Sequence, residues 1–262
     1  MGTVLAVVNQ KGGVGKSTTA VNLGACLAEL GQRVLIVDID PQGNASSGLG
    51  IDKKKLEASV YQVLLEEKPL QDVILQTAIP RLDIAPATIA LAGAEVELVS
   101  GLSREMRLKG ALAKLQSAYD TILIDCPPSL GLLTLNALAA ASGALVPIQC
   151  EYYALEGLGQ LIKTLDLVRK HLNPSLTVAG VVLTMYDART NLSQQVISEV
   201  RNFFREKVYQ TVIPRNVKLS EAPSFGQPII LYDERSRGAE AYRNLAREFC
   251  GLPFEKGEVA NE

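Results

Sequence analysis

Short apolar runs alternate with amphipathic stretches along most of the chain. The apolar runs are partly β-branched and predict strands buried on both faces, at residues 4–8, 34–38, 82–85, 121–125, 144–148, 178–184 and 208–213. Between them, helical spacing of apolar residues predicts helices over residues 20–30, 89–99, 104–117, 132–141, 156–171, 192–205 and 238–249. This alternation predicts an α/β fold with a doubly wound, mostly parallel sheet flanked by helices in three layers.

Composition narrows the class of protein. With 262 residues and 47% apolar content, we expect one domain over residues 1–250 and a disordered acidic tail over residues 251–262. The four cysteines lie far apart, which disfavours a zinc site or disulfide framework and favours buried thiols in a reducing cytoplasm. The net charge of −2 confines any nucleic-acid contact to a local basic patch. We expect no signal peptide and no membrane-spanning helix, because no apolar run reaches the ~18 residues that such a helix needs.

A glycine-rich segment, NQKGGVGKST at residues 9–18, lies between the first predicted strand and the first predicted helix. Glycines at positions 12, 13 and 15 allow the backbone to curl with its N–H groups pointing inward, where a phosphate chain can lie. Lys16 can reach the β- and γ-phosphates, and the Ser17 hydroxyl can bind Mg²⁺. The segment therefore predicts a nucleoside-triphosphate site, the alternative being an ordinary glycine-rich turn.

The segment departs from the usual pattern G-x-x-x-x-G-K-[ST] at its first glycine. Gln10 takes that position, and a second lysine, Lys11, stands at the front of the loop. From there Lys11 can point across a two-fold axis into the nucleotide of a second copy. The alternative is that Lys11 serves its own nucleotide or faces solvent.

Acidic residues end two of the predicted strands. Asp40 follows the second strand, and Pro41 ends regular structure after it, so Asp40 is placed to hold a Mg²⁺-bound water or the attacking water. Asp38 has a structural alternative, in which it only accepts hydrogen bonds from nearby backbone donors. Asp125 ends the apolar strand at residues 121–125 and is a candidate partner of Mg²⁺. Together with the glycine-rich loop, these acids predict hydrolysis of a nucleoside triphosphate.

A serine hydrolase is the weaker interpretation of the same region. Ser129 follows a Pro-Pro turn, but the single histidine, His171, lies at the end of a predicted helix. That position is more typical of a helix C-terminus than of a general base.

These segments carry a resemblance to a known family. Residues 11–18 (KGGVGKST) resemble the deviant Walker A motif of the MinD/ParA ATPases. Further segments resemble the ParA branch closely: residues 38–44 (DIDPQGN), 124–129 (IDCPPS), 149–157 (QCEYYALEG), 184–190 (TMYDART) and 212–224 (VIPRNVKLSEAPS). The resemblance extends from about residue 1 to residue 249 and implies a P-loop NTPase fold.

The resemblance implies a role for each matching residue. Lys11 would be the signature lysine that crosses a dimer interface, and Lys11, Lys16 and Asp40 would form the catalytic set. ATP would be held by Lys11, Gly12, Gly13, Val14, Gly15, Lys16, Ser17, Thr18, Pro214 and Asn216. Within this set, Pro214 and Asn216 would lie at the adenine. Mg²⁺ would be held by Ser17, Asp40 and Asp125.

The resemblance also implies partners and a location. The expected partners are a second copy of the chain joined by ATP, non-specific double-stranded DNA of the nucleoid, and a ParB-type centromere-binding protein. A replication initiator is a further candidate. Arg189 and Lys218 would contact DNA, although Lys218 is an arginine in some relatives. With no N-terminal helix-turn-helix before the loop, the chain matches the short type that binds DNA without sequence preference.

Three alternatives remain open on the residues. The arginines and lysines near the predicted DNA contacts could form an ordinary solvated surface. A membrane-bound regulator like MinD needs a C-terminal amphipathic helix, whereas residues 251–257 (GLPFEKG) break a helix and are not basic. A metabolic synthetase or electron-transfer ATPase of the same fold is the third, although an iron–sulphur site needs grouped cysteines and only Cys126 lies near the predicted nucleotide.

Overall fold

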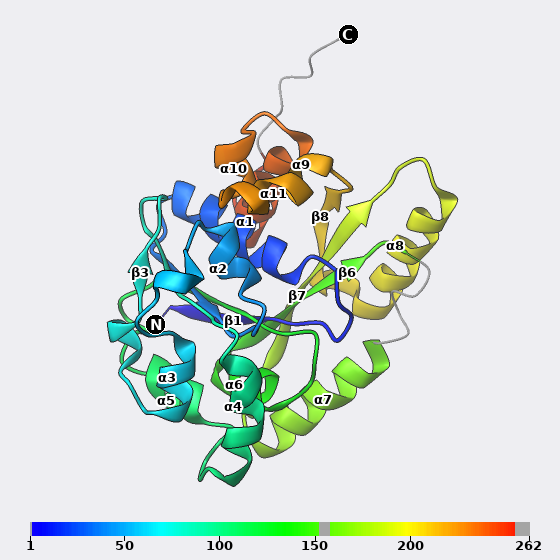
Figure 1. The fold of residues 1–262 in the computed structure, drawn as a ribbon. Coiled ribbons are helices and arrows are strands. Elements are labelled where there is room, and N and C mark those ends of the chain that lie inside the picture. Colours follow the sequence, from blue (N-terminus) through cyan, green and yellow to red (C-terminus); the bar gives the residue numbers. More distant parts are fainter. Residues whose placement is uncertain (1, 152–157, 255–262) are drawn as a thin grey trace.

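The computed structural model describes residues 2–151 and 158–254, and a single eight-stranded sheet runs through them (Figure 1). Its strand order is β3-β4-β2-β5-β1-β6-β7-β8, and every neighbouring pair is parallel except β3 and β4. The strands are β1 (Thr3–Val7), β2 (Val34–Asp38), β3 (Leu75–Gln76), β4 (Leu82–Ala85), β5 (Thr121–Asp125), β6 (Gly143–Gln149), β7 (Thr177–Tyr186) and β8 (Val208–Pro214). The predicted α/β class with a mostly parallel sheet is confirmed.

Helices cover both faces of the sheet and give the three layers. One face packs against α3 (Val60–Leu65), α4 (Leu91–Glu97), α5 (Arg107–Leu112), α6 (Leu132–Ala140), α7 (Leu158–His171) and α8 (Asn191–Phe204). The other face packs against α1 (Lys16–Glu29), α2 (Asn44–Gly48), α9 (Val217–Glu221), α10 (Ile229–Tyr232) and α11 (Arg237–Phe249). In Figure 1 the second group forms the upper part of the molecule, and α3 to α7 lie in the lower part.

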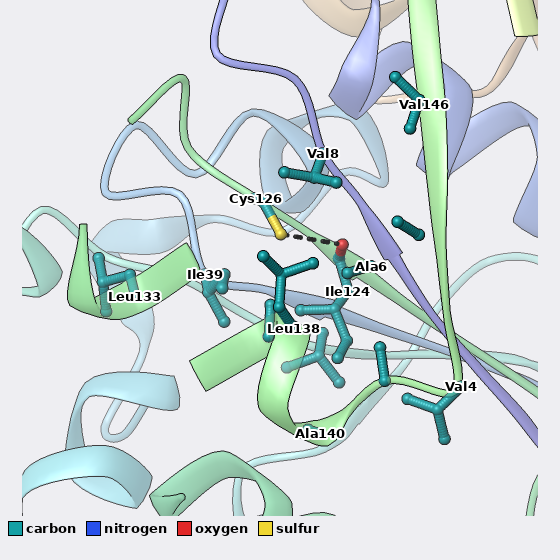
Figure 2. Close-up of a cluster of buried hydrophobic side chains, with 14 of the residues drawn as sticks. Val4, Ala6, Val8, Ile39, Ile124, Cys126, Leu133, Leu138, Ala140 and Val146 are labelled. Atoms are coloured by element: carbon teal, nitrogen blue, oxygen red, sulfur yellow. Dashed lines mark hydrogen bonds between the residues drawn. The ribbon is translucent and has the colours of Figure 1, made fainter. Parts of the chain in front are cut away.

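Each strand feeds two cores because its side chains alternate between the faces. In β1, Val4 and Ala6 join the cluster under α3 to α8, while Leu5 joins the cluster under α1 and α11. Figure 2 shows the first cluster where it reaches the end of β5, with Cys126 beside Ile124. The Cys126 thiol donates to the Ile124 carbonyl at 3.6 Å. Burial on both faces explains why the strands are continuous apolar runs in the sequence.

Some predicted helices are shorter than the sequence pattern indicated. The helix predicted over residues 104–117 is regular only in α5, and tighter i→i+3 bonds follow it, from Leu115 N to Leu112 O and from Ala118 N to Leu115 O. The prediction over residues 89–99 resolves into α4 followed by a 3₁₀ turn, Leu98–Ser100. Residues 152–157 of one family motif and residues 255–262 of the predicted tail lie outside the described residues.

Strand register brings the predicted acids to one edge of the sheet. Asp125 at the end of β5 lies opposite Val7 of β1 on one side and Asp38 of β2 on the other. Strand β1 lies inside the sheet, between β5 and β6. The chain passes from β1 to β2 on one side of β1, and later from β5 to β6 on the other side, so the direction of winding reverses at β1. Ligands of doubly wound sheets bind at such a switch point, beyond the carboxyl ends of the strands.

Candidate nucleotide-binding site

The loop between β1 and α1 is held open by side chains at its start. Asn9 Nδ2 donates to Pro147 O at 2.7 Å, and Asn9 Oδ1 accepts from Lys11 N at 3.0 Å. Gly13 and Gly15 adopt φ angles of 72° and 88°, in the left-handed region that glycine reaches without steric cost. The predicted curled backbone is therefore present, and it leads directly into the N-terminus of α1.

Lys16 is the first residue of α1, and its side chain turns back into the loop. Its Nζ donates to the backbone carbonyl of Lys11 at 3.1 Å, and only 6% of the residue is exposed. Burial lowers the pKa of Lys16, while the nearby carboxylate of Asp125 acts in the opposite direction. The ammonium group therefore lies inside the loop, close to the acid that ends β5.

Asp38 is occupied by structural hydrogen bonds. It accepts from the backbone N–H of Asp40 at 3.1 Å and from both the N–H and the hydroxyl of Ser46, at 2.8 and 2.7 Å. Burial raises the pKa of Asp38 to about 6, although the bonds from Ser46 oppose the shift. The structural alternative considered for Asp38 is the one that these contacts support.

Asp125 has the opposite character. Both of its carboxylate oxygens are buried, and neither accepts a well-formed hydrogen bond from the described residues, although the Ser17 hydroxyl lies close enough to act on the pKa of the group. Burial and the neighbouring charge of Asp38 raise the pKa of Asp125 well above its ordinary value, while Ser17 and Lys16 oppose the shift. An unpartnered buried carboxylate beside a serine hydroxyl fits a divalent cation, which prefers oxygen ligands.

The donor set for such a cation is small. Within the part of the chain that the structure describes, no cluster of three or more His, Cys, Asp or Glu side chains forms a metal cage. A magnesium ion that keeps several waters and takes phosphate oxygens needs only one or two carboxylates. Ser17 and Asp125 therefore fit as its protein ligands, and Ser17 and Asp40 line the same cavity.

Asp40 lies in a tight turn just after β2. It is 5% exposed, its Oδ1 accepts from Gln42 N at 2.9 Å, and its carbonyl accepts from Gly43 N at 2.8 Å. The turn leads into α2, whose N-cap, Gly43, has a φ of 61°. Asp40 thus follows the end of β2, two strands away from β1, and lines the same cavity as Lys16 and Ser17.

Two adjoining cavities extend from the loop. The first has a volume of about 530 Å³ and is lined by loop glycines, Lys16, Ser17 and Asp40. The second has a volume of about 560 Å³ and is lined by Pro214, Asn216 and Tyr242 among others. The cavities share four lining residues: Gly15, Thr18, Met185 and Pro223. The residues expected at the phosphates and those expected at the adenine therefore line one continuous region.

Thr184 and Met185 are among the site residues that were not singled out from the sequence. Thr184 Oγ1 donates to the carbonyl of Val14 at 2.9 Å and so ties the loop to the end of β7. Met185 lines both cavities with a φ of 53°, unusual for a residue other than glycine. Both lie in the motif at residues 184–190, but only the folded sheet brings that segment to the loop.

Lys11 lies at the mouth of the loop. It is half-buried and is not among the described residues that line either cavity, although its carbonyl accepts the bond from Lys16. The structure therefore separates the two lysines: Lys16 faces the cavity, whereas Lys11 stands at its rim.

The candidate DNA contacts follow the neighbouring ends of β7 and β8. Tyr186 pairs with Pro214 in the sheet, and Arg189 and Lys218 lie three and four residues beyond these positions. Arg189 pairs with Asp187 through Nη2 at 2.6 Å, and Lys218 Nζ pairs with Glu221 at 3.1 Å. Both cations lie on one edge of the sheet, and each already has an acidic neighbour.

Neither the thiols nor the helices point to another class of site. Cys26, Cys126 and Cys150 are buried free thiols, in agreement with their predicted place in the core, and Cys250 is half-buried. Among the described residues, no helix combines the length and apolar character needed to cross a bilayer.

Comparison with known proteins gives the site a family. A family model described as "AAA domain" matches residues 2–178. Sporulation initiation inhibitor protein Soj of Bacillus subtilis (strain 168) is 64% identical over 248 residues, which are 95% of this chain and 98% of that relative. Chromosome partitioning protein ParA of Myxococcus xanthus is 56% identical over 95% of this chain and 88% of its own length.

A similar solved structure is a cobyrinic acid a,c-diamide synthase from Mycobacterium smegmatis with bound ADP and magnesium. It has a TM-score of 0.83 and 42% identity, and the match covers 97% of this chain and 99% of that one. Fold and sequence agree with the resemblance seen in the motifs. The chain belongs to the ParA/Soj family of chromosome-partitioning ATPases.

Proposed function

We propose that residues 1–250 form one domain that binds ATP with Mg²⁺ and then pairs with a second copy of the chain. The ATP-bound dimer binds nucleoid DNA without sequence preference and releases the DNA after ATP is hydrolysed. A ParB-type partner accelerates that hydrolysis. The single observation that carries the proposal is the buried Asp125 carboxylate, which accepts no well-formed hydrogen bond from the described residues and lies beside Ser17 and Lys16. The relatives named as partitioning proteins support the biological role.

Hydrolysis of ATP in this site needs placement rather than a strong base. The loop glycines and the N-terminus of α1 hold the phosphates through backbone N–H groups, and Lys16 adds a full positive charge. Ser17 and Asp125 would hold Mg²⁺, which would neutralise charge on the phosphoryl group. Asp40 orients the attacking water from the turn after β2. Pro214 and Asn216 line the space for the adenine.

Pairing of two copies explains the second lysine. Lys11 is half-buried and is outside the set of described residues that line the cavity, which supports a role for its side chain outside its own site. Across a two-fold axis, each Lys11 would add a cation to the nucleotide of the other protomer. ATP is then part of the interface, and its hydrolysis weakens the pair.

DNA binding follows from pairing by simple arithmetic. Each protomer offers few cations, and the chain as a whole is acidic, with a net charge of −2. Joining two weak phosphate-binding patches raises the binding constant toward the square of the single value, less a linkage cost. Arg189 and Lys218 are the proposed contacts, and ATP controls them only through dimerisation. A replication initiator is a further proposed partner.

The similarity to a cobyrinic acid a,c-diamide synthase supports a second candidate, an ATP-dependent metabolic enzyme of the same fold. The two candidates differ in what they bind. A metabolic enzyme has no need of DNA, whereas a partitioning ATPase binds DNA only in one nucleotide state.

The test is a titration of double-stranded DNA against the protein with ATP, with ADP and without nucleotide, with and without a ParB N-terminal peptide. At fixed salt, we expect tight binding with ATP only, and the peptide should raise ATP turnover and shorten the lifetime of the complex. Equal DNA affinity in all three nucleotide states would contradict the proposal, and absence of DNA binding would favour the metabolic candidate.

A further inference from the structure

Three consecutive lysines, Lys53, Lys54 and Lys55, form a 3₁₀ helix shortly after α2. A 3₁₀ helix has three residues per turn, so neighbouring side chains point about 120° apart. Lys54 and Lys55 are exposed, whereas Lys53 is half-buried. The local geometry therefore directs one of three chemically identical side chains back toward the body of the protein.

Lys53 reaches the turn that carries Asp40. Its Nζ donates to the backbone carbonyl of Gln42 at 2.7 Å and to that of Gly43 at 3.2 Å. The ammonium group has three donors and no acceptor, so it can serve two carbonyl oxygens at once. Hydrogen bonds from a charged donor are shorter and stronger than neutral ones.

The stem of Lys53 is in close contact as well. A Cβ built on Gly43 would lie 2.8 Å from Lys53 Cδ and 3.2 Å from the carbonyl oxygen of Ala87. Position 43 suits glycine because its φ of 61° is left-handed, and an added Cβ would also displace the end of the Lys53 side chain and crowd the Ala87 carbonyl.

The same turn holds Asp40 from inside. The Asp40 carbonyl accepts from Gly43 N, and its Oδ1 accepts from Gln42 N. Gln42 and Gly43 thus bond to Asp40 through their N–H groups and to Lys53 through their carbonyls. Movement of these two peptide units would displace the carboxylate.

We propose that Lys53 is a positioning residue, which fixes the turn of residues 40–43 so that Asp40 faces the phosphate loop. The inference rests on the proposed role of Asp40 in hydrolysis. It adds that contacts made by this chain alone order the turn, through the two bonds that Lys53 donates.

The test compares Lys53→Met with Lys54→Met, which removes the same charge from the next, exposed position of the same 3₁₀ helix. The first measurement is hydrogen exchange of residues 40–48 in the nucleotide-free protein. We expect about tenfold faster exchange there in Lys53→Met, equivalent to about 1.4 kcal/mol, and the native rate in Lys54→Met. Amides of β1 and β5 serve as the internal reference for intact folding.

The second measurement is steady-state ATP turnover. In Lys53→Met we expect kcat to fall about three- to tenfold with KM for ATP within twofold of its native value, because Asp40 is displaced while the phosphate loop is unchanged. Native exchange in Lys53→Met, or an equal effect of Lys54→Met, would overturn the inference. Since the exchange needs no nucleotide, its result stands whether or not the proposed DNA-segregation role is correct.

Discussion

At the scale of single residues, the site is built on contrast between two neighbouring carboxylates. Asp38 accepts three hydrogen bonds, whereas neither buried oxygen of Asp125 accepts a well-formed hydrogen bond from the described residues. A buried, unsatisfied charge costs folding free energy. We infer that Asp125 is kept for ligand binding at the expense of stability.

Asp125→Asn tests this inference, because the neutral amide relieves the buried charge and its repulsion with Asp38. We expect the nucleotide-free variant to be more stable by roughly 1–3 kcal/mol, which raises Tm by several degrees, and to lose Mg²⁺-dependent nucleotide binding. Thermal denaturation at about pH 8 measures the first effect. Asp72→Asn, at an exposed position, is the control and should leave Tm unchanged.

The difference in stability between Asp125→Asn and the native protein should grow as pH rises. In the folded protein the pKa of Asp125 is raised, so its carboxyl takes up a proton before it would in the unfolded chain. The cost of the buried charge is therefore present at high pH and disappears as pH falls through the folded-state pKa. The stability advantage of Asp125→Asn should therefore narrow as pH falls from the alkaline side toward the ordinary carboxyl pKa of 3.8. A variant that melts below the native protein at the higher pH would contradict this account.

Lys16→Ala removes the ammonium group from the loop. We expect ATP affinity to fall roughly 100-fold or more, because at least two charge-assisted hydrogen bonds of about 1.5–3 kcal/mol each are lost. Isothermal titration calorimetry measures it, with the exposed Lys170→Ala as the control. Native affinity in Lys16→Ala would remove this residue from the phosphate site.

At the scale of elements, the short helix α2 connects the site to the core. Ser46, buried within α2, donates its hydroxyl to Asp38 at 2.7 Å and accepts from Ala87 N at 3.0 Å. One side chain thereby joins β2, α2 and the segment after β4. The position of the turn before α2, and so of Asp40, depends on this link.

Ser46→Ala should lower the free energy of unfolding by about 2–3 kcal/mol, because a buried N–H and a buried carboxylate each lose a partner. Urea denaturation measures the change, and Ser47→Ala in the same helix is the matched control. If the two variants lose the same stability, the bridging role of Ser46 is wrong.

Among the helices and strands, those that could be located best from the sequence are the ones whose burial requires a regular pattern of apolar residues. The runs for β1, β2, β4 and β5 could be located because strands covered on both faces need unbroken apolar residues. Strand β3 has two residues, and α2, α9 and α10 have four or five, so none has room for a period.

In the candidate site, too, some residues could be predicted from the sequence pattern and others could not. Lys16, Asp40 and Asp125 were predicted because each follows a strand end or lies in a glycine-rich loop. The contact of Thr184 with the loop joins segments that are distant along the chain. The contact of Lys53 with the Asp40 turn is made by one of three consecutive lysines, which the sequence alone does not distinguish. Only the tertiary structure distinguishes them.

At the scale of the whole molecule, the proposed DNA contacts and the nucleotide cavities lie at the same carboxyl edge of the sheet. Arg189 follows β7 and Lys218 follows β8, whose last residue, Pro214, lines the second cavity. Each cation has an acidic neighbour, so exposed ion pairs must be exchanged for phosphates on binding. Such pairs are weak in water, and the exchange costs little.

Arg189→Glu should lower the DNA affinity of the ATP-bound protein by roughly tenfold at fixed salt and reduce the slope of affinity against salt, because phosphate contacts are lost. A mobility-shift titration measures this. Lys114→Glu, an equal charge reversal at an exposed position just beyond α5, is the control. DNA affinity equal in the two variants would remove Arg189 from the contact surface, and dimerisation should be intact in both.

The central claim is that ATP joins two copies of this chain, and sedimentation of Asp40→Ala tests it most directly. With hydrolysis blocked and with saturating ATP and Mg²⁺, the account predicts a persistent species of twice the monomer mass, and the monomer alone when nucleotide is withheld. A protein that sediments as a monomer under the first condition would contradict the account.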